Sequence, residues 1–279
     1  MHTQYHIPRH RQLAVICALA VLALAGKASA QVGLGLIPMR EDLALAPGAA
    51  HSGVLTLDND SPEKVRVVAE LLDFYIDATG TPQFGREYSQ EAAFSCRTWL
   101  SVNPMEMELE GDAHLPVRYT VRTPPGATER SNHCAIGFST QPTASLTKGT
   151  GLRTAVQIVA AIYVVVGKPV EEGSIKDLKL EYVPDPKQPG WRAVVVLANP
   201  SLMHYRPNGD LDVLDGAGKV VESAKFMPMP VLPKRDQRFL FPLKLEAGPG
   251  KYTLRARVDL GGSDIQEATA LVVAAKTSQ

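Results

Sequence analysis

The chain has 279 residues and equal numbers of basic and acidic side chains, 29 of each. This length predicts two domains of ordinary size. The charge is balanced and the chain has no run of basic residues, so the sequence gives no indication of a basic surface that would bind nucleic acid or an anionic membrane.

The first thirty residues have the pattern of a secretory signal peptide. Basic residues around Arg9 and Arg11 precede the apolar stretch Leu13–Ala25, and Ala28-Ser29-Ala30 is a suitable cleavage site. The apolar stretch is too short for a comfortable membrane span, and no stop-transfer segment follows it. We therefore expect a mature chain that starts at Gln31, is periplasmic or secreted, and does not insert in the membrane after signal cleavage.

The next stretch, residues 31–167, alternates apolar and polar residues between turn signals, which is typical of β-strands. Val65–Ile76 is long enough for a helix, but its β-branched and aromatic residues favour a strand. A polar connection is expected after it, with a helical turn at Tyr88–Ala93. Ala155–Val166 is nearly all apolar, which suits a strand covered on both faces. The predicted strands are Val32–Ile37 with its continuation Leu43–Leu45, His51–Asp58, Val65–Ile76, Trp99–Val102, Met105–Leu109, Leu115–Val121, His133–Phe138 and Ala155–Val166.

Two cysteines, Cys96 and Cys134, remain after the expected cleavage, because Cys17 lies in the signal peptide. An even number of cysteines in an oxidising compartment permits one disulfide. The alternative is a pair of buried small apolar side chains.

A short polar stretch with Pro and Gly, Lys168–Ser174, is the predicted linker to a second domain at residues 175–279. Tyr252 follows Gly248-Pro249-Gly250, and we expect it to pack and to hydrogen-bond back to the chain, as at the corner of immunoglobulin-like sandwiches. The predicted strands are Ile175–Tyr182, Trp191–Ala198, an extended Leu202–Tyr205, Asp210–Leu214, Lys219–Phe226, Arg238–Leu245, Tyr252–Val258 and Ile265–Val273. The predicted fold is all-β, with two immunoglobulin-like β-sandwich domains in series.

The expected mature chain contains no motif for catalysis, for a cofactor or for a metal ion. It has no nucleophile elbow, no Walker-type glycine loop and no paired zinc-binding histidines. Three aspartates at 210, 212 and 215 lack the spacing of a calcium loop. We therefore predict no enzymatic activity, no cofactor and no metal. A hydrolase would enter only if the fold placed His133 or His204 beside carboxylates in a pocket.

The segment Thr98–Phe138 combines W-x-x-V-x-P with V-R-Y-T-V-x-x-P-P-G-A. It resembles the amino-terminal domain of PapD-like proteins, a group that includes the periplasmic pilus chaperones, and the resemblance covers most of residues 32–167. The runs RPNGDLDVLDGAGKVV, VLPKRDQRF and GPGKYTLRARVDLGG are similar to the immunoglobulin-like domain that follows PapD-like domains in secreted bacterial proteins.

This resemblance implies a binding mechanism. Pilus chaperones hold a partly folded subunit by strand addition to a sheet edge. An arginine on their first strand and a lysine on the last strand of the first domain bind the subunit's terminal carboxylate in the interdomain cleft. Arg40, in I-P-M-R-E-D-L, best matches that arginine. The alternative is a solvated arginine beside Glu41 and Asp42.

The lysine of this pair has no direct counterpart. Ala160 or Ala161 falls at the position where the resemblance places it. Lys148 and Arg153 lie just before the same strand and could substitute for it if the preceding loop folds back.

The predicted function is that of a non-catalytic, periplasmic, chaperone-like protein. Its partner would be a secreted or surface protein subunit of pilus type, bound by edge-strand pairing or at the interdomain cleft. The alternative is a structural or adhesive cell-envelope module that binds a cell-wall polymer or surface protein, which accounts better for the missing lysine. No nucleic-acid partner is expected.

Overall fold

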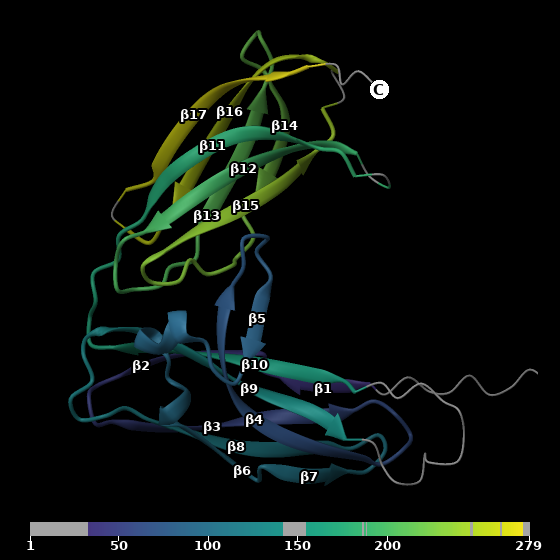
Figure 1. The fold of residues 1–279 in the computed structure, drawn as a ribbon, viewed down its shortest axis with the longest axis vertical. Helices are drawn as coiled ribbons and strands as arrows, with labels where there is room; N and C mark the ends of the chain where they lie inside the picture. Colours follow the sequence, from purple (N-terminus) through teal and green to yellow (C-terminus); the bar gives the residue numbers. More distant parts are fainter. Residues whose placement is uncertain are drawn as a thin grey trace, which may run out of the picture.

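The structure is a computed structural model that describes residues 33–141, 155–185, 187, 189–245, 248–262 and 264–275. Strands form two β-sandwich domains that follow one another along the chain (Figure 1). This confirms the predicted all-β class of two immunoglobulin-like sandwiches. The predicted signal peptide lies outside the described residues.

The first domain consists of two sheets packed face to face. One sheet has the order β1 (Leu34–Ile37), β3 (Ala50–Asn59), β8 (His114–Arg122), β6 (Leu100–Asn103). The other has the order β2 (Arg40–Leu45), β10 (Gln157–Val166), β9 (Arg130–Gln141), β4 (Val65–Ile76), β5 (Pro82–Gly85), and β7 (Glu106–Leu109) also pairs with β4. Every second residue of a strand faces the partner sheet. The resulting core includes Leu55, Leu57, Val117, Ile136 and Ile162, all inaccessible to solvent.

The chain crosses from one sheet to the other at Pro38. β1 pairs antiparallel with β3, whereas β2 pairs parallel with β10, starting with Arg40 opposite Ala161. Because β2 starts only there, Gln157–Ala160 at the beginning of β10 is paired with β9 alone among the described strands. The prediction of a strand covered on both faces holds from Ala160 onward, where most side chains are buried, but not at Gln157, which is exposed.

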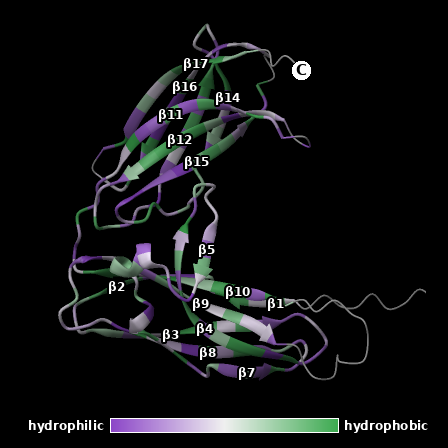
Figure 2. Ribbon diagram, in the orientation of Figure 1, coloured by the Kyte–Doolittle hydropathy of each residue, from purple (hydrophilic) through white to green (hydrophobic). Residues whose placement is uncertain are grey.

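The second domain is a smaller sandwich of the same kind. Its sheets have the orders β11 (Ser174–Val183), β12 (Gly190–Asn199), β15 (Arg235–Leu243) and β14 (Val220–Lys225), β13 (Asn208–Leu214), β16 (Gly250–Asp259), β17 (Gln266–Ala274). Hydrophobic and hydrophilic residues alternate along many of these strands (Figure 2). The hydroxyl of Tyr252 donates to the carbonyl oxygen of Gly248 at 2.5 Å, which confirms the predicted tyrosine corner.

Three local predictions differ from the structure. Pro82–Gly85 is not a polar connection but strand β5, because Phe84 pairs with Phe74 of β4 and packs against it. Leu202–Tyr205 forms no strand, and only Tyr205 makes an isolated bridge, to Val231. Trp99 belongs to a 3-10 helix, Arg97–Trp99, that precedes β6. The predicted helical turn is present as the 3-10 helix Ser89–Phe94.

The two domains are in direct contact. The β4–β5 hairpin rises from the first domain toward β15 of the second (Figure 1), and the Gln237 side chain donates to the Asp77 carbonyl oxygen at 3.0 Å. Leu232 of the second domain is buried in a cluster with Phe74 and Tyr163 of the first. These contacts position the cleft between the domains.

Candidate partner-binding cleft

A cleft of about 360 Å³ lies where β2 and β10 of the first domain meet the loop before β13 of the second. The side chains that line it include Arg40, Asp42, His204 and Arg206. The structure therefore places the sequence-predicted Arg40 at the interdomain cleft.

Arg40 is the first residue of β2, and its side chain is about half exposed at 51%. Its Nε lies 2.9 Å from Oδ2 of Asp42, two residues along the same strand and therefore on the same face. Arg40 therefore has features of both interpretations of the sequence. It borders the cleft, as a carboxylate-binding arginine would, and it is partly exposed and paired with a neighbouring acid. Its role in binding a partner stays a prediction.

Arg206 brings a second guanidinium to the cleft from the other domain. Its Cζ lies 4.6 Å from the centre of the Tyr163 ring, a cation–π geometry, and its Nη2 lies 3.6 Å from Oδ1 of Asp42. Burial raises the pKa of the Tyr163 hydroxyl, although the nearby Arg206 charge opposes this shift. Sequence reasoning missed Arg206. Its only signal was a cation next to a histidine and a tyrosine before a Pro-Asn-Gly turn.

His204 connects the domains beneath these cations. Its Nδ1 lies 2.5 Å from the hydroxyl of Ser131 on β9, and its ring stacks on Tyr163 with ring centres 4.8 Å apart. The backbone N–H of Ser131 also donates to the Leu202 carbonyl oxygen at 2.8 Å. Burial, with a further contribution from the Arg206 charge, lowers the pKa of His204 from 6.5 to about 4. The imidazole is therefore neutral near pH 7.

Ser131, His204 and Asp42 have the side-chain types of a hydrolytic triad. His204 also lies beside a carboxylate in a pocket, the arrangement that would point to a hydrolase. Their arrangement is different from a triad, however. The Ser131 hydroxyl is fully buried, and the His204 Nε2 to Asp42 Oδ1 distance is 3.9 Å. A nucleophile must reach its substrate and its base must be oriented by a hydrogen bond. These residues instead form a contact between the domains.

A second cluster of charged and polar side chains joins the domains around Glu91. Glu91 and His133 are 2% and 1% exposed, with 3.3 Å between Oε2 and Nε2. The Arg235 guanidinium of the second domain donates to Glu91 Oε1 at 2.6 Å. Burial alone raises the pKa of Glu91, but the hydrogen bond and charge of His133 and the charge of Arg235 outweigh burial, so the pKa lies below its usual value. Glu91 and His133 are buried, whereas the Arg235 side chain is 41% exposed, and together they form a contact between the domains.

The beginning of β10, Gln157–Ala160, has an open edge that lies next to Arg40. Backbone N–H and C=O groups alternate sides along a strand. The N–H of Ala161 donates to the Met39 carbonyl oxygen on the side away from β9. The same groups of Gln157 and Val159 therefore point away from β9 too, toward the edge on which no described strand pairs with them. Ile37 and Met39, 65% and 57% exposed, border this edge.

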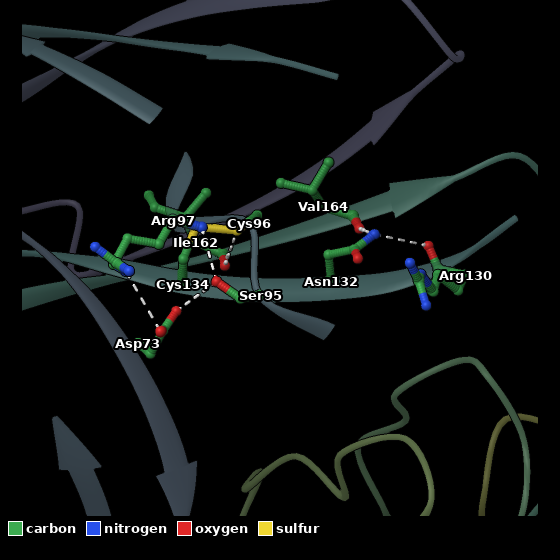
Figure 3. The surroundings of a disulfide bond; sticks show 9 residues. All are labelled: Asp73, Ser95, Cys96, Arg97, Arg130, Asn132, Cys134, Ile162 and Val164. Atoms are coloured by element: carbon green, nitrogen blue, oxygen red, sulfur yellow. Dashed lines mark hydrogen bonds and ion pairs between the residues drawn. A yellow bond between two sulfur atoms is a disulfide. The ribbon is translucent and has the colours of Figure 1, made fainter. Parts of the chain in front are cut away.

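A disulfide joins Cys96 to Cys134, as predicted (Figure 3). It attaches the short helical segment before β6 to β9, which is paired on both sides by β10 and β4. Beside it, the Ser95 hydroxyl donates to Asp73 at 2.5 Å, and Arg97 lies 3.4 Å from the same carboxylate. The other two predicted binding residues, Lys148 and Arg153, lie outside the described residues.

Within the described part of the chain, no group of three or more His, Cys, Asp or Glu side chains could hold a metal ion. The aspartates weighed for calcium have other partners: Asp212 pairs with Arg255 at 2.6 Å, and Asp215 accepts from the N–H groups of its own turn. Over the same residues, the structure contains no helix with the length and apolar character of a membrane span.

No protein-family model matches the chain, and no curated protein matches it in sequence. Among solved structures it is similar to the class 5 fimbriae chaperone CfaA, with 13% identity and a TM-score of 0.44 over 87% of this chain and 100% of that one. The Escherichia coli chaperone DraB is 18% identical, with a TM-score of 0.42 over 85% and 98% of the two chains. A chain from the complex of the Salmonella enterica SafA pilin with the SafB chaperone is 14% identical, with a TM-score of 0.44 over 87% and 99%.

These solved structures belong to the chaperone group that the PapD-like resemblance of the sequence indicated.

Proposed function

We propose that the protein is a non-catalytic, chaperone-like protein of the periplasm or cell exterior, which binds an extended segment of a secreted or surface protein along the open edge of β10. The observation that carries the proposal is that this open edge ends at Arg40. The expected signal peptide and the disulfide support an extracytoplasmic location.

The edge has the properties needed for strand addition. The backbone groups of Gln157 and Val159 that face away from β9 pair with no described strand and can hydrogen-bond to an added one. The exposed Ile37 and Met39 side chains offer apolar contacts beside it. A strand that pairs along Gln157–Ala160 cannot continue past Ala161, because β2 occupies the edge from Arg40 onward. The end of the bound strand therefore meets Arg40, and a terminal carboxylate there would accept charge-assisted hydrogen bonds.

The first experiment is purification of the tagged full-length protein from its own host without reductant, with identification of co-purifying proteins by mass spectrometry. We expect Val159→Pro to abolish capture, because proline removes the N–H that faces the open edge while leaving the β9 ladder intact. Val159→Thr keeps that N–H and is the matched control. Arg40→Ala is expected to weaken capture about tenfold or more, whereas Arg118→Ala on β8 of the opposite sheet is expected to leave it unchanged.

Retention of one stoichiometric partner by both Val159→Pro and Arg40→Ala would contradict this site. Absence of any protein partner, together with sedimentation of the purified protein with isolated envelope material, would favour the alternative of a polymer-binding envelope module.

A further inference from the structure

Asp42 is held between two arginines that come from different domains. Its Oδ2 faces Arg40 Nε of the first domain at 2.9 Å, and its Oδ1 faces Arg206 Nη2 of the second at 3.6 Å. His204, also near Oδ1, is neutral near pH 7 because burial lowers its pKa to about 4. The two guanidiniums are therefore the cations that this carboxylate meets in the cleft.

The contact with Arg206 is incomplete. A distance of 3.6 Å is longer than a hydrogen bond, and Nη2 of Arg206 is buried without a hydrogen-bond partner among the described residues. Only 19% of this side chain is exposed, so its charge is poorly solvated. Asp42 is tethered to β2 by a short side chain, and its backbone is fixed by pairing with Tyr163 of β10. A carboxylate from outside has no such tether.

The position of Asp42 also permits exchange. Its side chain is 45% exposed, and both it and Arg40 line the open cleft. Rotation of Asp42 toward solvent would cost little at Arg40, because that pair is about half exposed and therefore weak. At Arg206 it would give up a contact of 3.6 Å, which is longer than a hydrogen bond. The rotation would leave two guanidinium groups facing the same volume, an arrangement that suits one carboxylate with two oxygens.

We propose that Arg40 and Arg206 form a two-arginine carboxylate site that spans both domains, and that Asp42 is its resident occupant, which a ligand carboxylate displaces. This inference rests on the proposed function, because the ligand would be the terminal or side-chain carboxylate of the bound segment. In this site the second domain supplies one of the two cations, Arg206. The bound carboxylate then replaces Asp42 as the bridge between the two cations, so the ionic link across the cleft is kept when the ligand binds.

The test uses the full-length protein labelled with ¹⁵N-arginine, with acetate as the probe and the uncharged acetamide as its control. Arginine Nε–Hε resonances, assigned with Arg40→Lys and Arg206→Lys, are followed by NMR during titration. We expect acetate to shift both resonances along one binding curve and acetamide to shift neither. In Asp42→Asn, acetate affinity is expected to rise about three- to tenfold, because the competing occupant is removed.

Asp212→Asn is the matched control, because it also releases an arginine, Arg255, from its carboxylate. In this variant the Arg40 and Arg206 resonances should respond to acetate as in the wild type. Acetate should bind the single freed Arg255 several-fold more weakly than it binds the two arginines of Asp42→Asn.

Unchanged acetate affinity in Asp42→Asn would overturn the resident role of Asp42. A response of Arg40 without Arg206 would overturn the two-arginine site. Neither result concerns co-purification of a partner, so the proposed function could survive both. If Asp42→Asn does not fold, the wild type decides, since the Asp42 carboxyl ¹³C resonance must then move together with both arginine resonances.

Discussion

At the scale of single residues, the polar groups buried between the domains determine how the molecule responds to acid. The His204 ring is 8% exposed and stacks on Tyr163, while Ser131 occupies its Nδ1. Burial and the Arg206 charge lower its pKa from 6.5 to about 4. A histidine with a lowered pKa takes up its proton more readily when the chain is unfolded.

We therefore expect His204 to destabilise the fold in acid. Its contribution to the free energy of unfolding is fully present above about pH 6.5 and is lost as the pH falls toward 4, by roughly 3 kcal/mol in total. Urea unfolding between about pH 7 and pH 4 should show this loss in the wild type and not in His204→Gln. His114→Gln, which alters an exposed histidine on β8, is the control. Parallel pH curves for the wild type and His204→Gln would contradict the assignment.

At the scale of elements, the two domains use the same turn after equivalent strands. Asn59, at the end of β3, donates from its side chain to the carbonyl oxygens of Glu63 at 2.8 Å and Glu110 at 2.9 Å. Asn199, at the end of β12, donates in the same way to Met203 at 2.8 Å and Val231 at 2.9 Å. In each turn a serine two residues later donates to the asparagine oxygen at 2.7 Å. A buried amide thus donates hydrogen bonds to backbone groups and accepts them from serine around each turn.

The disulfide is the covalent link between elements of the first domain. Cys96 and Cys134 are 38 positions apart, and closing a loop of that length in the unfolded chain corresponds to about 3–4 kcal/mol of stabilisation. We expect the Cys96→Ala/Cys134→Ala double variant to lose about that much in urea unfolding. The wild type in dithiothreitol should reach the same midpoint, whereas dithiothreitol should leave the double variant unchanged. Equal stability of oxidised and reduced wild type would contradict this role.

At the scale of the whole molecule, a small apolar cluster couples two domains that each have a core of their own. Leu232 of the second domain is 3% exposed and packs with Phe74 and Tyr163 of the first. The ion pair between the buried Glu91 and the partly exposed Arg235 lies nearby, at 2.6 Å. The cleft that holds Arg40 and Arg206 exists only while these contacts hold the domains together.

We expect Leu232→Ala to weaken this coupling by about 2–4 kcal/mol, the cost of a cavity at a buried leucine. Thermal unfolding should then separate into two transitions, and the radius of gyration from X-ray scattering should increase. Leu202→Ala, at a side chain that is 41% exposed, removes the same atoms and should change neither measurement. A single unchanged transition in Leu232→Ala would show that other contacts are sufficient.

Local chemistry was sufficient to predict most strands, the tyrosine corner and the disulfide pair. Each of these depends on alternation, on a turn residue or on cysteine number, which can be read within a short stretch. Strand β5 was missed because Gly80, Pro82 and Gly85 obscure the single apolar anchor Phe84. Arg40 was selected through a resemblance to PapD-like chaperones, and its neighbour Asp42 entered only as an acid beside a solvated arginine.

Tertiary structure alone decided what surrounds Arg40. Nothing in the sequence around Arg206 indicates that its loop lies against β2 and β10, because this proximity arises from the contact between two domains far apart in the chain. The open edge of β10 likewise depends on where β2 starts, since Arg40 pairs with Ala161 and leaves the preceding residues uncovered. Sequence patterns report on the environment of a strand or a turn, whereas the cleft and the edge are defined by which distant elements pack together.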